Sequence, residues 1–436
     1  MGPRVVVIGG GSAYMPGIAF AVAHAAEAFS GGTLVLQDID VDALELQRRL
    51  TTSILRSRGG GDVLVEAQPD RLRAMEGADV VLAAFRPGGL EARHLDERIA
   101  VDHGIIGQET AGPGGLAMAL RSVPIVLEIV EELRHVGNDA VLLNYTNPVQ
   151  IVSEAVHRFA PGLPYLGLCD QTAGEQELLG RVLGVPAGSV ELDTRGTNHM
   201  TFTRAVRVGG HDVTDELWAL LDTLDLGELE DTADRRVVRL FRMLRCVPSE
   251  YLQYFFFHDE VLAEQRAAGR TRAQEVMAIL PDVLESYRRE ADAEMPRPSM
   301  ARANEDHGDF AVRIAATMLT GGTERTILNL PNVGQIEDLP RDAIVETPAV
   351  VAGRDVEAIP QGAMPPEVAG LVRQVAAHAA LAAEAALTGD RALAVKAMAI
   401  HPLVRSVGTA ESLVDAYLSA HAAHLPRFHR VDPSAA

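Results

Sequence analysis

Three glycines near the start of the chain are the first residues whose types and spacing could do chemistry. They occupy positions 9–11, after the apolar run Val5–Ile8 and before an alanine-rich stretch of helical period, so the segment predicts a strand, a tight turn and a helix. Glycine permits positive φ, and it lets a pyrophosphate reach the backbone N–H groups at a helix start. We therefore expect a dinucleotide to bind at Gly9, Gly10, Gly11, Ser12, Ala13 and Tyr14.

A second strand supports the dinucleotide interpretation. The apolar run Thr33–Gln37 ends in Asp38, whose carboxylate could hold a ribose hydroxyl of NAD. Tyr14 stands where the usual pattern has its third glycine, and Asp38 lies further along the chain than usual, which a longer first helix explains. The alternative is an ordinary glycine turn in an α/β sheet, with Asp38 as a helix cap.

Two further polar residues follow a predicted strand in the middle of the chain. Cys169 and Asp170 come directly after the strand expected at Tyr165–Leu168. Thr172 and Glu175 have the spacing of a capping box, so we expect the next helix to begin there. Because a helix start is electropositive, it favours the thiolate of Cys169 over the thiol.

The composition excludes several classes of partner. The formal charge of −21 argues against nucleic acid and anionic membranes, which require basic surfaces. The chain enters a buried strand without a leader segment, and no apolar run has the length needed to cross a bilayer. The two cysteines, Cys169 and Cys246, are too few for a disulfide framework. We expect a cytoplasmic protein that binds neither nucleic acid nor membrane.

Alternating strand and helix patterns predict an α/β fold with a parallel sheet. Helical periodicity covers residues 41–57 and 116–135, and apolar strands are expected at 79–85 and 140–143. A chain of 436 residues exceeds one comfortable core. We therefore expect an NAD-binding Rossmann domain over residues 1–165 and an α/β domain for substrate binding, metal binding and oligomerisation over residues 166–436.

Several segments in order along nearly the whole chain together resemble glycoside hydrolase family 4, the NAD-dependent glycosidases. They are Gly9–Ser12, Phe85–Gly89, Gly107–Thr110, Thr146–Val149, Gly167–Cys169, Thr197–His199 and Leu330–Gly334. The resemblance implies an exception to two-carboxylate glycoside hydrolysis. NAD⁺ takes hydride from C3 of the sugar, a metal polarises the C3 oxygen, a base removes the C2 proton and the aglycone leaves. Water then adds and the ketone is reduced, so there is no net redox.

The resemblance also implies a metal site and an assembly. Cys169 and His199 match the metal ligands of the family, whose usual ion is Mn²⁺, and a thiolate with an imidazole suits a borderline divalent ion. Taken alone, the pair would normally be interpreted as a small buried hydrophobe and a satisfied core histidine. A homodimer or homotetramer is implied as well.

Two catalytic groups are expected, a general acid and a base. Asp170 resembles the acid of family members that act on α-glycosides, although the residues after it, Gln171 and Thr172, differ from the Met-Pro of the 6-phospho-α-glucosidase branch. The segment that often supplies a tyrosine base carries Asp306 and His307 instead. We expect Asp306 to be the base and His307 to be the second choice. A charged surface loop is the alternative, and Tyr251 or Tyr254 could also supply a phenolate.

The remaining candidates contact sugar or cofactor. Asn147 and Asn198 match positions that hold sugar hydroxyls, and either could instead cap a turn. Arginine forks fit phosphate, sulfonate or carboxylate, and each candidate arginine could instead form a structural ion pair. The expected residues that bind the anion or the substrate are Arg86, Arg93, Glu109 and Arg302. Arg86 is also expected to contact the cofactor.

We therefore expect hydrolysis of a small, α-linked glycoside, with a phosphate, sulfonate or carboxylate on the sugar as open possibilities. The first alternative is an NAD-dependent sugar or hydroxy-acid dehydrogenase, because Thr146–Val149 and a late histidine also resemble the lactate and malate dehydrogenases. The same likeness implies a similar arrangement of two domains. A non-catalytic NAD-dependent sensor is the second alternative.

Overall fold

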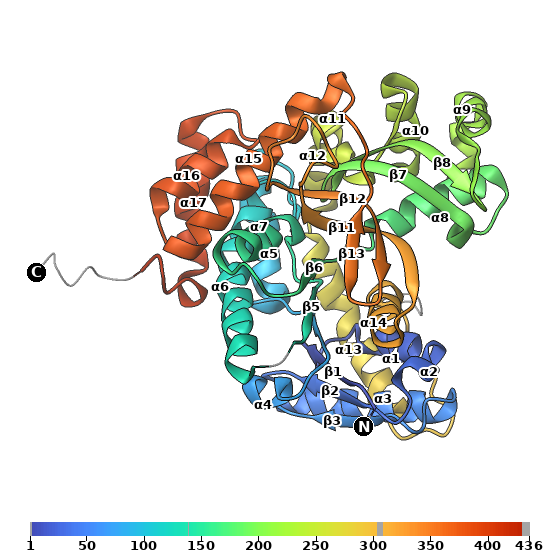
Figure 1. The fold of residues 1–436 in the computed structure, drawn as a ribbon. Coiled ribbons are helices and arrows are strands. Elements are labelled where there is room, and N and C mark those ends of the chain that lie inside the picture. Colours follow the sequence, from blue (N-terminus) through green and yellow to red (C-terminus); the bar gives the residue numbers. More distant parts are fainter. Residues whose placement is uncertain (1, 138, 303–307, 430–436) are drawn as a thin grey trace, which may run out of the picture.

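A nine-stranded sheet runs through the centre of the protein in a computed structural model, which describes residues 2–137, 139–302 and 308–429 (Figure 1). Its order is β13-β12-β11-β6-β5-β4-β1-β2-β3, with the strands from β6 to β3 parallel and β11, β12 and β13 added antiparallel. The strands are β1 (Arg4–Ile8), β2 (Thr33–Gln37), β3 (Leu64–Ala67), β4 (Val80–Ala83), β5 (Val141–Asn144), β6 (Tyr165–Gly167), β11 (Thr323–Pro331), β12 (Ile344–Ala352) and β13 (Asp355–Ala358).

Helices cover both faces of this sheet, as a parallel sheet requires. Val6 and Ile8 of β1 face one core, and Val5 and Val7 face the other, because side chains alternate along a strand. The helices packed in the first core are α6 (Gly112–Val136), α7 (Val149–Phe159), α15 (Pro366–Thr388), α16 (Arg391–Ile400) and α17 (Val407–Ala420). The second core contains α1 (Met15–His24) and α14 (Asp309–Thr320).

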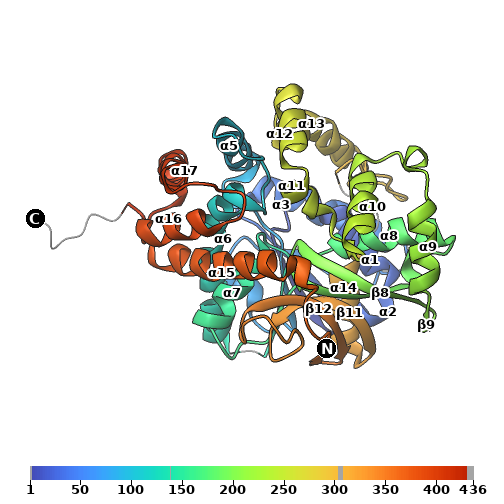
Figure 2. The ribbon, with the colours of Figure 1, turned by 90° about the horizontal axis from the view of Figure 1, so that it is seen from above.

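A smaller antiparallel sheet lies beside the large one. It consists of β7 (Val190–Thr197), β8 (Met200–Val208), β9 (His211–Asp212) and β10 (Val247–Pro248). Seen from above, α15 to α17 lie on one side of the molecule, and the helices around the small sheet lie on the other (Figure 2). Those helices are α8 (Gln171–Leu183), α9 (Thr214–Thr223) and α10 (Thr232–Leu244).

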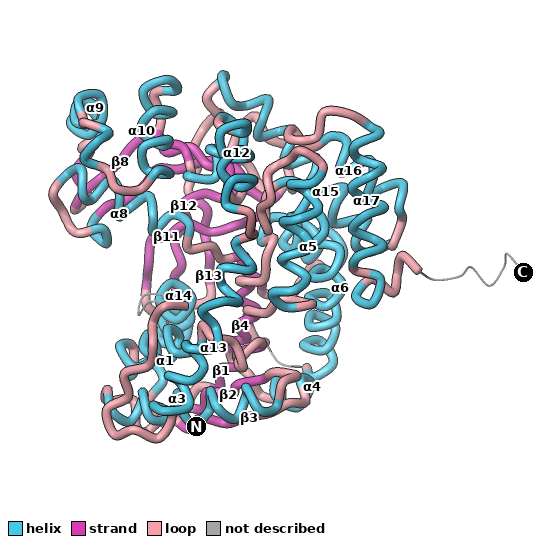
Figure 3. Tube along the Cα trace, turned by 180° about the vertical axis from the view of Figure 1, so that it is seen from behind, coloured by secondary structure: helices cyan, strands magenta, loops and turns pink. Residues whose placement is uncertain are grey.

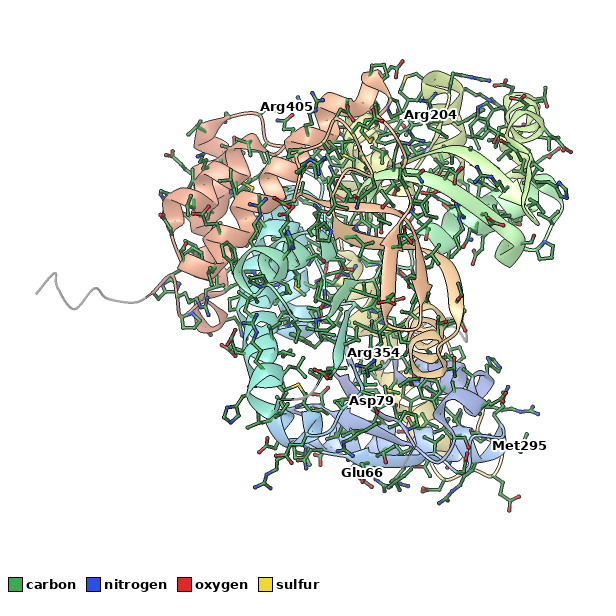
Figure 4. The ribbon with its side chains drawn as sticks, in the orientation of Figure 1. Glu66, Asp79, Arg204, Met295, Arg354 and Arg405 are labelled. Carbon is green, nitrogen blue, oxygen red and sulfur yellow. The ribbon has the colours of Figure 1, made fainter. Side chains whose placement is uncertain are left out.

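The remaining helices pack against these cores or connect the layers. They are α2 (Ala26–Phe29), α3 (Val41–Ser57), α4 (Arg71–Met75), α5 (Gly89–Asp102), α11 (Gln253–Phe256), α12 (His258–Ala268) and α13 (Arg272–Glu290). Helix α13 packs on both α3 and α5 (Figure 3). Just before β4, Asp79 lies beside Arg354 of the β12–β13 turn, with Arg354 Nη2 3.8 Å from Asp79 Oδ1 (Figure 4). This ion pair connects the β12–β13 turn with the segment before β4, and all three strands belong to the same sheet.

The predicted parallel α/β fold is confirmed, and two local predictions are wrong. Helix α8 begins at Gln171, with Asp170 as its N-cap residue and without a side-chain capping bond, because Glu175 is buried and bonds elsewhere. The expectation that no apolar run is long enough to cross a bilayer is also wrong, because helix α6 passes that test by length and composition. However, 83% of its apolar window is buried inside the protein, so its apolar residues serve the core. The domain boundary at residue 165 stays a prediction.

Candidate active site

The glycine turn follows β1 at the carboxyl edge of the sheet, where ligands bind in folds of this kind. Gly9 has a φ of 93°, and a Cβ there would lie 2.2 Å from the carbonyl oxygen of Ala84. A Cβ on Gly11 would lie 2.9 Å from the carboxylate of Asp38, which accepts the Gly11 N–H at 2.9 Å. Asp40, and not Asp38, caps helix α3. Asp38 is therefore held against the turn rather than used as a helix cap.

Helix α1 presents its N-terminus next to this turn. Tyr14 is its N-cap residue, no side chain caps the helix, and its first turn contains no acidic residue. Tyr287 of α13 donates its hydroxyl to the carbonyl oxygen of Ala13 at 2.8 Å and so fixes the turn from the other side. An uncapped helix N-terminus of this kind favours an anion such as a pyrophosphate.

Charged side chains gather beside Tyr14. The Arg302 guanidinium lies 4.3 Å from the centre of the Tyr14 ring. Glu109 forms ion pairs with Arg86 and with Arg93, whose Nη1 lies 3.2 Å from Glu109 Oε1. The structural ion pairs that the sequence left as the alternative are therefore present for Arg86 and Arg93, and anion binding stays a prediction. Burial lowers the pKa of Arg302, and the charges of Arg93 and Arg86 add to that effect.

Cys169 and His199 meet at the end of β6. Cys169 Sγ lies 3.3 Å from His199 Nε2, and both side chains are buried. Burial lowers the pKa of His199 to about 3, so the imidazole is neutral. Burial, with Glu346 and Asp170 nearby, raises the pKa of Cys169 well above 9. The expected thiolate is therefore wrong for the metal-free protein, because burial outweighs the helix start.

The His199 ring is held on three sides. Asn198 and His199 form the turn between β7 and β8, and His199 has a φ of 62°, a left-handed conformation that is rare for residues other than glycine. Tyr251 stacks on the ring, with centroids 3.7 Å apart and planes at 12°. The hydroxyl of Thr110 lies 3.0 Å from Nδ1. These contacts leave Nε2 as the ring nitrogen that faces Cys169.

A buried carboxyl supports the same turn and was not expected from the sequence. Glu346 of β12 accepts the side-chain amides of Asn198 and Asn329, each at 3.1 Å. Burial raises the pKa of Glu346 to about 7, partly offset by these amides. The signal was a glutamate inside a mostly apolar strand, β12, since glutamate is rarely buried without a partner. Because Asn198 bonds Glu346, it serves the turn as well as any substrate.

The other predicted site residues differ in their exposure and position. Asp170 is exposed at the start of α8, directly after Cys169. Asn147 is half-buried in the turn after β5. Asp306 and His307 lie outside the described residues. Burial, together with the neighbouring charges, raises the pKa of Tyr251 well above 10. Within the described ranges, no group of three or more His, Cys, Asp and Glu side chains is placed to hold a metal ion. That Cys169 and His199 hold a metal ion stays a prediction.

The chain thus combines a Rossmann-type sheet with a thiol–imidazole pair at the carboxyl edge that also carries the glycine turn. The family model described as Family 4 glycosyl hydrolase matches residues 4–185, and the model of the C-terminal domain of that family matches residues 194–404. The chain belongs to glycosyl hydrolase family 4 and is a glycosidase.

The alignments with similar proteins span nearly the whole chain. A Bacillus subtilis (strain 168) protein described as a probable 6-phospho-β-glucosidase is 32% identical over 434 residues, 98% of each chain. A 6-phospho-α-glucosidase from gut microorganisms, solved with NAD and glucose-6-phosphate, is 25% identical, with a TM-score of 0.87 over 97% of this chain and 99% of that one. The Thermotoga maritima 6-phospho-β-glucosidase, solved with manganese, NAD⁺ and glucose-6-phosphate, is 28% identical, with a TM-score of 0.86 over the same shares.

The expected likeness to lactate dehydrogenases holds for the fold. A lactate dehydrogenase from a deep-sea metagenome library has a TM-score of 0.55 at 16% identity, over 89% of this chain and all of that one. The dehydrogenase alternative is not favoured, because the family models and the curated relatives belong to glycosidases.

Proposed function

We propose that this protein hydrolyses small 6-phosphoglucosides with NAD⁺ and a divalent metal, Mn²⁺ being the first choice. The observation that carries the proposal is the buried, neutral thiol–imidazole pair of Cys169 and His199, which lies at the sheet edge that also holds the glycine turn. The relatives solved with NAD, manganese and glucose-6-phosphate support it. When bound, NAD⁺ and the metal supply a reversible oxidation of the sugar and stabilise charge on the neighbouring oxygen.

The glycine turn fits NAD. The uncapped N-terminus of α1 suits the pyrophosphate, and the glycine backbone suits its close approach. The Asp38 carboxylate suits a ribose diol and repels the extra phosphate of NADP. Ile39 and Val41, which flank this region, are 92% and 58% exposed and offer an apolar surface to an adenine ring.

The thiol–imidazole pair fits a metal ion. His199 is neutral and turns Nε2 toward Cys169, so its lone pair is available to a ligand. A cation near Sγ favours the thiolate, and binding therefore releases the thiol proton. Two protein ligands leave positions open for substrate oxygens.

The arginines beside Tyr14 fit the sugar phosphate. Arg93 and Arg302 offer guanidinium groups, whereas Glu109 holds Arg93 and Arg86 in place through ion pairs. Counted with Glu97, which binds Arg93, three arginines face two glutamates, so one positive charge remains for an anion. Asn147 and Asn198 stay candidates for sugar hydroxyls.

Two side chains, Tyr251 and Asp170, are proposed to move protons. Tyr251 is the C2 base, because its ring lies on His199 and a cation there lowers the cost of forming a phenolate. Asp306 and His307 stay the predicted rivals for this role. Asp170 protonates the leaving oxygen, from an exposed position next to Cys169. An aspartate here underlies the expectation of an α-linked substrate. We also propose a cytoplasmic homodimer or homotetramer with no nucleic-acid or membrane partner.

The substrate proposal is tested with p-nitrophenyl α- and β-glucosides, each with and without a 6-phosphate, in the presence of NAD⁺ and Mn²⁺. Phosphorylated substrates should have the higher kcat/KM, and Arg302→Gln should lower it about 10–100-fold for these substrates alone, as expected for a lost charge-assisted hydrogen bond. The matched control is Arg297→Gln, an exposed arginine five positions earlier. Equal rates with and without phosphate would rule out the phosphoglucoside assignment.

A further inference from the structure

The segment Gln108–Thr110 lies against the metal-binding histidine and makes a chain of hydrogen bonds to it. Gln108 Oε1 accepts the backbone N–H groups of Thr110 and Ala111, at 2.5 and 2.6 Å. The same oxygen lies 2.9 Å from the Thr110 hydroxyl, which lies 3.0 Å from His199 Nδ1. The chain ends at helix α6, which begins at Gly112.

The direction of every bond in this chain can be deduced. Backbone N–H groups only donate, so the Gln108 atom that faces two of them is the amide oxygen and not the nitrogen. An amide oxygen only accepts, and the Thr110 hydroxyl must therefore donate its single proton to it. The hydroxyl then has only lone pairs for His199, so Nδ1 must carry the proton and donate it.

The chain thereby selects one tautomer of a neutral ring. With the proton on Nδ1, Nε2 presents a lone pair to Cys169 Sγ, 3.3 Å away, which can accept the thiol S–H until a metal ion displaces that proton. The opposite tautomer would place an N–H where the metal must bind and would leave lone pairs facing each other at Thr110. The stacked Tyr251 ring limits rotation of the imidazole about this arrangement.

We infer that Thr110, oriented by Gln108, is a positioning residue that fixes the Nδ1–H tautomer of His199 and so prepares Nε2 to bind the metal. This inference rests on the metal site of the proposed function. It assigns a role to Gln108 and Thr110, which the proposed contacts to substrate and cofactor do not use. A partner on the second ring nitrogen commonly fixes the orientation of a metal-binding histidine, and its loss typically weakens metal binding by about 10–100-fold.

The first test measures Mn²⁺ dissociation constants of the NAD-loaded protein, by the electron paramagnetic resonance signal of free Mn²⁺. Thr110→Val replaces the hydroxyl by a methyl group of similar size and should weaken Mn²⁺ about 10–100-fold. Thr110→Ser keeps the hydroxyl and should stay within about threefold of the wild type. Thr214→Val, which removes a half-buried hydroxyl at the start of α9, is the control and should leave the constant unchanged. Wild-type affinity in a folded Thr110→Val protein would overturn the inference.

The second test needs no variant at Thr110 and reads the tautomer directly. In metal-free protein with ring-¹⁵N histidine, the His199 signals are identified among the 14 histidines by their loss in His199→Gln. Protonated Nδ1 and unprotonated Nε2 are expected, and the opposite pattern would overturn the inference. If the wild type bound no Mn²⁺, the proposed function would lose its metal, whereas the tautomer would still decide this inference.

Discussion

Glu175 gives the sharpest prediction about stability, because it is a carboxyl buried inside the protein. It is 5% exposed, accepts the Gln171 side-chain amide at 2.9 Å, and accepts the Thr203 hydroxyl at 3.0 Å. Burial raises its pKa from 4.5 to about 7, with smaller contributions from Glu346 and Glu250 and opposition from the two hydrogen bonds. The folded protein therefore holds a proton on Glu175 that the unfolded chain releases near pH 4.5.

The sign and size of the effect follow from proton linkage. Below pH 4.5 both states carry the proton, and the favourable contribution of the protonated group is complete. Between pH 4.5 and about 7 only the folded state keeps it, so stability falls as the pH rises, and above about 7 the loss stops. At about 1.4 kcal/mol per pKa unit, the loss is about 3 kcal/mol.

Glu175→Gln should remove this pH dependence. A glutamine amide has the shape of the protonated acid, so its oxygen can accept from Gln171 and its nitrogen can donate to Thr203. The variant should therefore match the wild type near pH 4.5 and exceed it by about 3 kcal/mol at pH 8.

The assay is urea unfolding at pH 5 and pH 8 without ligands, at one protein concentration. Glu177→Gln, an exposed position on the same helix, is the control and should show no such pH-dependent gain. A difference between Glu175→Gln and wild type that stays the same at both pH values would refute the reasoning.

Three further predictions concern single side chains. Tyr251→Phe keeps the ring stacked on His199 but should slow the exchange of the C2 proton, measured by NMR, about 100–10,000-fold. Asp306→Asn should exchange within about threefold of the wild-type rate. If Asp306→Asn were instead the slow variant, Asp306 would be the base. His199→Gly should be about 1 kcal/mol more stable than His199→Ala in urea, since φ is 62° there, and equal stabilities would show that the turn stores no strain. In the wild type, the fully buried Arg121 donates to both carboxylate oxygens of Asp96, at 2.9 and 2.6 Å. Asp96→Asn leaves Arg121 without its countercharge and should lower the free energy of unfolding by about 3–5 kcal/mol. A loss below about 1 kcal/mol would contradict this.

The elements of the fold could be predicted because their signals are local. The valines of β1 and the glycine turn lie within a few residues of one another, so β1 and the start of α1 follow from the local pattern, and the helical period of residues 41–57 predicts α3. The order of strands in the large sheet did not follow, since β11 joins β6 from more than 150 residues away.

The site could be predicted in its residue types but not in its physical state. The sequence indicated Cys169 and His199, yet the helix start suggested a thiolate, because the burial that keeps the thiol protonated comes from β12 and the small sheet. The capping-box spacing failed for a similar reason: Glu175 turns into the core toward Thr203 of β8. Long-range contacts of this kind leave no local signature.

The role of Tyr251 shows the same limit. It was one of two tyrosines, with Tyr254, that could supply a phenolate, and its stacking on His199 distinguishes it. Asp306 and His307 stay predictions from their types and positions. A base has to lie near the proton that it removes, and distance in the sequence does not report that proximity.

The central claim is redox-assisted elimination without net redox, and one experiment tests it most directly. A 6-phosphorylated p-nitrophenyl glucoside is hydrolysed in D₂O with NAD⁺ and Mn²⁺, the sugar product is examined by NMR, and NADH is followed by absorbance. Deuterium at C2 of the released sugar, with no accumulation of NADH, is the predicted result. Hydrolysis without deuterium at C2, or NADH formed in step with product, would contradict the account.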